Sequence, residues 1–139
     1  MTSGLVIDAS VSGCWCFPDE ASSFSEAVFD EVVRSGSVVP ALWVLEMANL
    51  LANGERRGRI KPDRVSVIRD AMAALPIEID QALGLRSLPT MVRTARDYDL
   101  TAYDASYLEL AMRTHSPLAT LDKTLKRAAA QAGVALFSV

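Results

Sequence analysis

The sequence has few of the residues that bind soft metals or form disulfides. It contains one histidine and two cysteines, and Cys14 and Cys16 stand two positions apart. Such close neighbours rarely form a disulfide, and a zinc site usually needs more cysteine and histidine ligands than this chain offers. We therefore expect both cysteines to be packing residues.

Long hydrophobic segments are also missing. The most apolar stretch, residues 38–54, is interrupted by Glu46, so it is a poor candidate for a transmembrane helix. The N-terminus reaches Asp8 after three apolar residues, a run too short for a secretory signal. Half of the residues are hydrophobic, which argues against disorder. We expect a soluble cytoplasmic protein with one domain, residues 1–139.

The chain has no excess of positive charge. Its net charge of −3 is a weak argument against nucleic-acid binding, because such proteins usually present a basic surface. Two bound divalent cations, which add four positive charges, would bring the net charge to +1. Net charge therefore does not decide whether the partner is a nucleic acid.

Apolar runs alternate with helical periodicities along the chain. The predicted strands lie near residues 4–8, 37–39, 76–80, 117–121 and 134–138. The predicted helices span about 22–34, 40–54, 63–74, 87–99, 102–114 and 123–133, the last closed by Gly133. This order indicates an α/β domain with a mostly parallel sheet of about five strands.

Three acids stand where such a fold places ligand-binding groups. Asp8 ends the first predicted strand and Asp122 ends the fourth, and the carboxyl ends of parallel strands share one edge. Asp104 begins the helix 102–114, although this helix follows another helix rather than a strand. Each acid also has a local explanation, since Asp8 and Asp122 can be N-caps and "TAYD" resembles a capping box.

Glu46 is the one charged residue in "VVPALWVLEMANLLANG". A helix that is hydrophobic all round is normally buried, and we expect its apolar flanks to pack against the sheet. A buried carboxylate costs several kcal/mol unless it is paired or bound to a metal. Capping does not explain a mid-helix residue. The alternatives are an ion pair with a buried arginine, a position at the rim of the helix, or a site shared with the other acids.

One shared site would account for all four acids. Clustered carboxylates raise one another's pKa values unless a cation neutralises them. Oxygen ligands without histidine or cysteine suit Mg²⁺ or Mn²⁺. Such an ion binds phosphates, lowers the pKa of a bound water and stabilises the charge that develops in phosphodiester hydrolysis. The four acids are thus compatible with a nuclease site that has no nucleophilic side chain.

Four blocks of the sequence resemble the PIN-domain family and, within it, the VapC-like toxins of toxin–antitoxin modules. They are "VIDASV", "VVPALWVLEMANLL", "LTAYDASYLELAMR" and "PLATLDKTLKRAA", in this order and spacing, and the match covers nearly the whole chain. The resemblance implies a three-layer α/β/α domain and a metal-dependent ribonuclease.

By position, the resemblance places the family's acidic quartet on Asp8, Glu46, Asp104 and Asp122. It implies that Asp8, Asp104 and Asp122 bind Mg²⁺ or Mn²⁺, with Asp8 and Asp104 as direct ligands. Glu46 and Asp122 would complete the shell or hold and deprotonate the attacking water.

The resemblance to the PIN-domain family also implies supporting roles for polar residues near the quartet. Ser10 and Thr120 match small hydroxyl residues that support the family's site. Asn49 lies one helical turn from Glu46 and shares its face, so it either orients that carboxylate or faces solvent.

Two groups of basic residues are candidates for RNA contacts, and two protein partners are expected. Lys123, Lys126 and Arg127 follow Asp122 and are candidates for phosphate contacts. A second basic cluster is either an RNA contact or a solvated charged face; it comprises Arg56, Arg57, Arg59, Lys61 and Arg64. The resemblance further implies a homodimer, inhibited by a small antitoxin whose C-terminal segment lies in a groove and places an arginine among the acids.

Two other functions remain open from the sequence. The first is another Mg²⁺-dependent phosphoryl-transfer enzyme or receiver-type switch on a similar sheet, with Asp8 in a phosphate site. A receiver has paired acids after the first strand where "IDAS" has one, and an aspartyl phosphatase has a second aspartate where Ser10 stands. The second is a non-catalytic module whose acids bind a partner's arginine.

Overall fold

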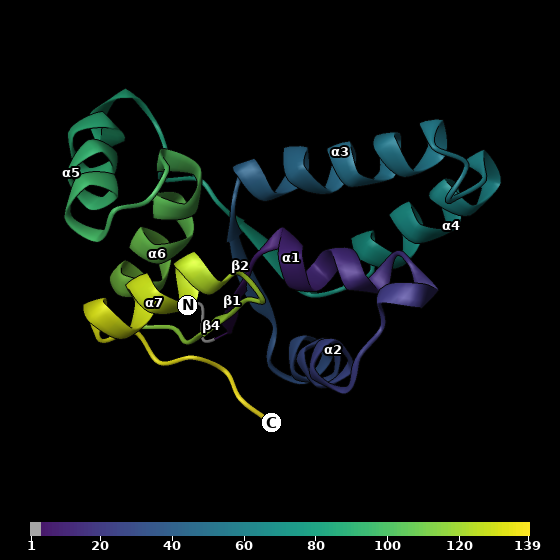
Figure 1. Ribbon diagram of the computed structural model, residues 1–139, viewed down its shortest axis with the longest axis horizontal. Coiled ribbons are helices and arrows are strands. Elements are labelled where there is room, and N and C mark those ends of the chain that lie inside the picture. The colour runs from purple at the N-terminus through teal and green to yellow at the C-terminus, as the bar shows by residue number, and fades with distance from the viewer. Residues whose placement is uncertain (1–3) are drawn as a thin grey trace.

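A parallel β-sheet forms the centre of the structure, a computed structural model that describes residues 4–139 (Figure 1). Within those residues the sheet has four strands in the order β3-β2-β1-β4, and each neighbouring pair is parallel. The strands are β1 (Leu5–Ile7), β2 (Ser37–Pro40), β3 (Ile77–Asp80) and β4 (Leu118–Ala119). The predicted α/β fold with a parallel sheet is confirmed.

The predicted fifth strand, near residues 134–138, is reduced to a bridge. Leu118 pairs in parallel with Leu136, and the backbone N–H of Leu118 donates to Ala135 while that of Phe137 donates to Leu118, both at 2.9 Å. Because β4 has only two residues, it offers this segment few backbone groups for strand pairing. The sequence pattern identified its position beside the sheet but overstated its pairing.

Helices cover both sides of the sheet. Helices α5, α6 and α7 lie on one side, and α1 to α4 lie on the other (Figure 1). The α-helices are α1 (Ala9–Ser12), α2 (Ser23–Ser35), α3 (Leu42–Arg56), α4 (Pro62–Ala73), α5 (Leu88–Tyr98), α6 (Ala102–Thr114) and α7 (Lys123–Ala132). Three 3₁₀ turns within the described residues are Gly13–Trp15, Pro18–Glu20 and Leu85–Ser87.

Local signals explain where several helices begin and end. Ser22 caps α2 by accepting from the backbone N–H of Ser25, and Pro62 occupies the first turn of α4, where its missing N–H is tolerated. Gly133 ends α7 with φ +74°, a left-handed conformation that favours glycine. These short-range effects are the reason that the six predicted helices match the observed ones within two residues.

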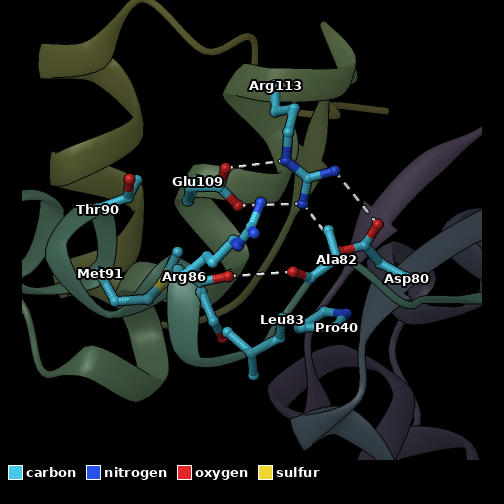
Figure 2. A pocket seen from close by; sticks show the side chains of 11 residues that line it. Pro40, Asp80, Ala82, Leu83, Arg86, Thr90, Met91, Glu109 and Arg113 are labelled. Carbon is cyan, nitrogen blue, oxygen red and sulfur yellow. Dashed lines mark hydrogen bonds and ion pairs between the residues drawn. The ribbon is translucent and has the colours of Figure 1, made fainter.

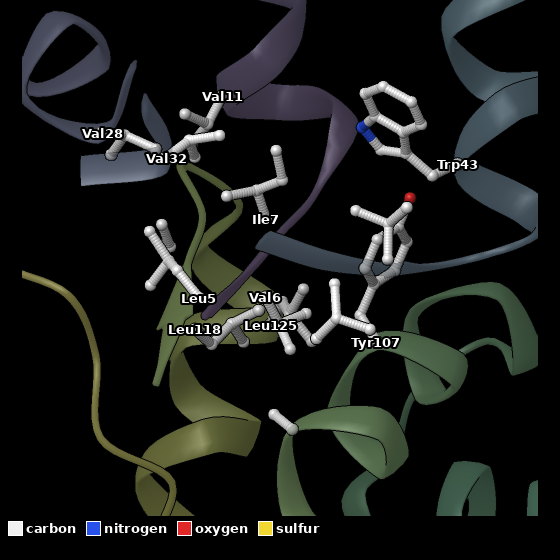
Figure 3. Close-up of a cluster of buried hydrophobic side chains, with 14 of the residues drawn as sticks. Leu5, Val6, Ile7, Val11, Val28, Val32, Trp43, Tyr107, Leu118 and Leu125 are labelled. Carbon is white, nitrogen blue, oxygen red and sulfur yellow. The ribbon is translucent and has the colours of Figure 1, made fainter. Parts of the chain in front are cut away.

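The core lies on both faces of the sheet. Leu5, Val6 and Ile7 of β1 are at most 2% exposed, which is expected for a strand covered on both sides. Leu118 and Tyr107 extend this cluster toward β4 and α6 (Figure 3). Cys14 and Cys16 are buried free thiols, in agreement with their predicted packing role.

Helix α3 is less buried than its composition predicts. Trp43 and Met47 face the core, whereas Val44 and Leu45 are 47% and 69% exposed. The expectation that apolar flanks on all sides mean burial on all sides is therefore wrong, because α3 packs along one face. Among the described residues, no helix combines the length and apolar character needed to cross a membrane.

Candidate active site

Asp8 lies at the carboxyl edge of the sheet, directly after β1, and is 6% exposed. Its Oδ1 accepts a hydrogen bond from Ser10 Oγ at 2.6 Å and a longer one, 3.4 Å, from the backbone N–H of Val11. Its Oδ2 accepts from Thr120 Oγ1 at 2.5 Å. Neutral donors therefore hold both oxygens of a buried carboxylate.

Ser10 and Thr120 also connect the first and fourth strands. Ser10 Oγ accepts from the backbone N–H of Leu121 at 2.9 Å, and Thr120 Oγ1 accepts from that of Asp122 at 3.0 Å. Each hydroxyl thus relays a backbone donor of the β4–α7 connection to the carboxylate that follows β1. The two hydroxyl residues lie in contact with Asp8, and their supporting role in a catalytic site stays a prediction.

The local explanations hold for Asp8 and Asp122, whereas the predicted capping box at Asp104 is formed only by its Thr101 half. Asp8 caps α1, and Asp122 caps α7 through Oδ1, which accepts from the backbone N–H groups of Thr124 at 2.8 Å and Leu125 at 3.1 Å. Thr101 caps α6 by accepting from the backbone N–H of Asp104 at 3.1 Å. Capping and a shared site are compatible, because the capping bonds of Asp122 use one of its two carboxylate oxygens.

The charges of these aspartates act on one another. Burial raises the pKa of Asp8, and the charge of Asp122 raises it further, although its hydrogen bonds with Ser10, Thr120 and Val11 act in the opposite direction. Burial also raises the pKa of Asp104, with added contributions from Asp122 and Asp8. The three carboxylates from β1, α6 and the β4–α7 connection therefore lie within electrostatic reach of one another.

Glu46 approaches this group from α3 and is bound by a residue that the sequence reasoning missed. Tyr107 Oη donates to Glu46 Oε1 at 2.5 Å, and Tyr107 itself is 1% exposed. The pKa of Tyr107 is raised by burial first, then by its bond to Glu46 and by the charges of Glu46, Asp8 and Asp104. A signal was available, because Tyr107 follows Asp104 by three residues on α6 and shares its face.

Of the alternatives for Glu46, the structure favours a partly buried position at the rim of α3, next to the other acids. Within residues 4–139, no ion pair with Lys, Arg or His involves any of the four acids. The alternative of an ion pair between Glu46 and a buried arginine is therefore not formed among the described residues.

The residues present fit a hard divalent cation. Four carboxylates without a compensating side-chain cation are the donor set that Mg²⁺ or Mn²⁺ prefers. In the described part of the chain, no group of three or more His, Cys, Asp or Glu side chains is placed to hold a metal ion together. A Mg²⁺ ion does not need one, since it usually keeps several waters and binds through one or two carboxylates and substrate phosphates.

The other predicted site residues differ in their contacts. Asn49 is exposed on α3, and Lys123 and Lys126 are exposed on α7 beside Asp122. Arg127 donates to the backbone carbonyls of Tyr98 and Asp99, at 3.2 and 3.3 Å, and so satisfies the C-terminal end of α5. Its guanidinium is therefore already engaged in the fold, whereas both lysines are accessible.

Within the second basic cluster, Arg59 also has a structural role. It forms ion pairs with Asp19 and Glu20, at 3.2 and 2.9 Å, and its guanidinium lies 4.1 Å from the centre of the Phe17 ring. These contacts fasten the α3–α4 loop to the turn at residues 18–20. They account for Arg59 without an RNA contact.

A fifth acid at the same edge has a different environment. Asp80 ends β3, and the guanidinium of Arg113 lies between Asp80 and Glu109, with ion pairs of 2.8 and 2.9 Å (Figure 2). These three residues line a cavity of about 240 Å³ together with Arg86. Sequence reasoning took Asp80 as the end of a strand and assigned it no partner.

The structure also has an apolar groove, and none of the four acids lines it. Its volume is about 490 Å³, and it lies between α3, α5 and α6. Its large side chains are Leu42, Leu83, Leu85, Leu88, Met91 and Tyr103. Leu85 and Tyr103 are 87% and 66% exposed, and Tyr103 directly precedes Asp104. Such a contiguous exposed apolar surface is typical of a site that binds another protein.

A parallel α/β sheet with uncompensated carboxylates at its carboxyl edge defines a class of proteins that bind ligands at that edge. The model of the PIN domain family matches residues 5–131, so this chain belongs to the PIN-domain family. The family and fold expected from the four sequence blocks are thus confirmed.

Two proteins of Pyrobaculum aerophilum are similar to this chain. Ribonuclease VapC3 is 29% identical over 125 residues, which cover 87% of this chain and 91% of that protein. The crystal structure of PAE2754 aligns with a TM-score of 0.68 at 24% identity, over 92% of this chain and 87% of that one. The second similarity is one of fold.

Proposed function

We propose that this chain is a Mg²⁺- or Mn²⁺-dependent RNA endonuclease that acts as the toxin of a toxin–antitoxin pair. The observation that carries the proposal is the group of carboxylates around Asp8, which no side-chain cation within residues 4–139 neutralises. Membership of the PIN-domain family and the similarity to a protein named as a VapC ribonuclease support the same conclusion.

In this proposal Asp8, Asp104 and Asp122 hold the metal. When bound, a divalent cation lowers the pKa of a coordinated water and stabilises the charge that develops on the phosphate. Burial and mutual repulsion raise the pKa values of Asp8 and Asp104, so these carboxylates gain from a nearby positive charge. The cation therefore relieves an electrostatic cost that the fold itself creates.

The side chains of this chain supply orientation and proton transfer. Ser10 and Thr120 fix both oxygens of Asp8, so its carboxylate does not have to reorganise when a ligand arrives. Glu46, on the opposite helix, is the candidate to orient the attacking water and to accept its proton. No serine, threonine or cysteine nucleophile is required in this scheme.

Substrate binding would use charge next to the acids. Lys123 and Lys126 are exposed in the first turns of α7, directly after Asp122. Their ammonium groups would contact RNA phosphates on either side of the bond that is cut, independently of base sequence. Arg127 is a weaker candidate, because backbone carbonyls occupy its guanidinium.

The apolar groove is the candidate site for the antitoxin. An apolar segment seated on Leu85, Leu88 and Tyr103 would lie next to Asp104, so that a basic residue at its end reaches the acids. The exposed Val44 and Leu45 of α3 are candidates for contacts in the proposed homodimer. Light scattering on the purified chain tests the dimer, and a single-chain mass would contradict it.

A cleavage assay tests the central proposal. The purified chain is incubated with a labelled single-stranded RNA and with the matching DNA, in Mg²⁺, in Mn²⁺ and in excess chelator. We expect internal cleavage of the RNA that chelator abolishes and added Mn²⁺ restores. Cleavage that persists in chelator would contradict the metal dependence, and an inert chain would contradict the activity.

A second assay tests the role as a toxin. Expression of the chain should arrest growth, and co-expression of a small protein encoded beside it should relieve the arrest. Sequencing of RNA fragments after brief induction, with Asp8→Asn as the control, would identify the RNA and the cleavage motif. Harmless expression of folded protein would count against the toxin role.

A further inference from the structure

Tyr107 links the two sides of the acid group. Its ring belongs to the buried core on α6, and its hydroxyl points toward α3, the helix that carries Trp43 (Figure 3). The hydroxyl donates to Glu46 Oε1 at 2.5 Å across 61 positions of sequence. The bond is therefore short in distance but joins residues far apart in the sequence, a rigid core residue and a flexible carboxylate.

The bond opposes the repulsion among the acids. Negative charges on Asp8 and Asp104 act on the same hydroxyl that binds Glu46, so this hydroxyl lies within electrostatic reach of three acids. A free glutamate side chain with several rotatable bonds would turn away toward solvent, where its charge is better solvated. The Tyr107 hydroxyl instead holds one oxygen of Glu46 at the acid group.

Helix α3 is linked to Asp8 by a second buried contact, which runs through the side chains of Trp43 and Ser12. Trp43 Nε1 donates to Ser12 Oγ at 2.9 Å, and Ser12 Oγ donates to the backbone carbonyl of Asp8 at 3.0 Å. Trp43 precedes Glu46 by three residues, so this contact lies one turn away on the same helix. With the helix already fixed, the hydroxyl of Tyr107 is the contact that decides where the Glu46 carboxylate lies.

We propose that Tyr107 is a positioning residue, whose hydroxyl holds the Glu46 carboxylate against Asp8 and Asp104 for the cleavage reaction. This inference rests on the proposed ribonuclease function. Tyr107 acts through Glu46 and does not itself touch the substrate. The competing explanation is that Glu46 merely satisfies the hydroxyl of a buried tyrosine.

A double-mutant cycle separates the two explanations. Tyr107→Phe keeps the buried ring and removes the hydroxyl, and Glu46→Ala removes its acceptor. In the wild-type background, Tyr107→Phe should lower kcat by about 10- to 100-fold, as expected for a residue that orients a catalytic group, with little change in KM for RNA. In the Glu46→Ala background, the same substitution should leave kcat unchanged.

The melting temperature supplies a readout without RNA or metal. Tyr107→Phe should lower it by a few degrees in the wild-type background, and should not lower it in Glu46→Ala, where the hydroxyl has lost its acceptor. Tyr98→Phe, the same chemical change at the end of α5, is the matched control and should leave kcat unaltered. If Tyr107→Phe does not fold, 3-fluorotyrosine at position 107 keeps the ring and the donor while altering the strength of the bond.

The outcomes are distinguishable. An inactive wild-type chain would refute the proposed function and with it the catalytic part of the inference. An active wild type with an equally active Tyr107→Phe would overturn the inference alone, as would a loss of kcat that is the same in both backgrounds. If 3-fluorotyrosine at position 107 changes kcat in the wild-type background but not in the Glu46→Ala background, the inference is supported. If it does not change kcat in the wild-type background, the inference is overturned.

Discussion

Asp8 and Asp80 occupy equivalent places in the sheet but have opposite environments. Each lies at the carboxyl end of a parallel strand, β1 for Asp8 and β3 for Asp80. Asp80 is neutralised by Arg113, which also binds Glu109, whereas Asp8 is held by two hydroxyls and has acidic neighbours. The difference teaches that position at the edge does not by itself make a cation site. Asp80 has a compensating cation, and Asp8 has none among the described residues.

The comparison is tested most strongly by matched asparagine substitutions. Asp8→Asn should reduce RNA cleavage by more than about 10⁴-fold, beyond the usual contribution of a single general acid or base, because Asp8 is the proposed direct metal ligand. Asp80→Asn, at the same edge of the sheet, should cleave RNA like the wild type. Initial rates on one labelled RNA measure both. Similar losses in the two variants would show that the edge as a whole, rather than the uncompensated charge, carries the activity.

Glu46→Gln should have the next largest effect, a loss of about 10²- to 10⁴-fold in kcat. The amide keeps an oxygen that can accept from Tyr107, but it does not accept a proton from water. Circular dichroism and the melting temperature should match the wild type, because Glu46 is partly exposed at the rim of α3. Full activity would exclude Glu46 from the reaction and confine the site to the three aspartates.

Acidity and divalent cations should change the stability through Asp8 and Asp104. The pKa of each is raised in the folded state above its ordinary value of 3.8, so the fold binds more protons than the unfolded chain between that value and the raised one. The metal-free protein should therefore lose stability as the pH rises through this window, and regain it as the pH falls. Millimolar Mn²⁺ should raise the melting temperature at pH 7 and should raise it less as the pH falls toward 3.8, because protons then compete for the same carboxylates.

Differential scanning calorimetry of the wild type, Asp8→Asn and Asp80→Asn measures this effect. Asp8→Asn should be more stable than the wild type without metal at pH 7 and should respond less to Mn²⁺. Asp80→Asn should respond as the wild type does. An Mn²⁺ response that Asp8→Asn retains in full would place the cation elsewhere.

The smallest effect is expected from removing the cation that Arg113 supplies to Asp80 and Glu109. Arg113→Met leaves Asp80 and Glu109 without their cation and should lower the free energy of unfolding by about 1 kcal/mol, since the arginine side chain is 39% exposed and solvent screens the pair. RNA cleavage should not change. Urea unfolding measures the difference. A large loss of cleavage in Arg113→Met would mean that this cluster also belongs to the site.

Much of the architecture was predictable because its causes are local. Ser22, Thr101 and Asp122 mark helix starts through hydrogen bonds with residues two or three positions away, and Gly133 marks an end through its left-handed conformation. The strand ends before Asp8 and Asp122 followed from apolar runs of a few residues. These signals placed Asp8 and Asp122 at one edge before any long-range contact was known.

Two predictions failed where the outcome depended on distant neighbours. Composition suggested that α3 is buried all round, but how much of Leu45 is covered depends on which helices pack beside it. The segment near residues 134–138 has the apolar character of a strand, yet its pairing was limited by the two-residue length of β4. Neither fact is encoded within the segment concerned.

The sequence by itself determined the α/β alternation, the helix boundaries and the positions of Asp8, Glu46, Asp104 and Asp122, because periodicity and capping act over a few residues. Only the tertiary structure decided which charges are compensated. Arg113 reaches Asp80 across 33 positions and Tyr107 reaches Glu46 across 61, and contacts at such separations depend on how whole elements pack. The candidate residues were therefore visible in the chain, while the distinction between a compensated and an uncompensated acid arose from packing.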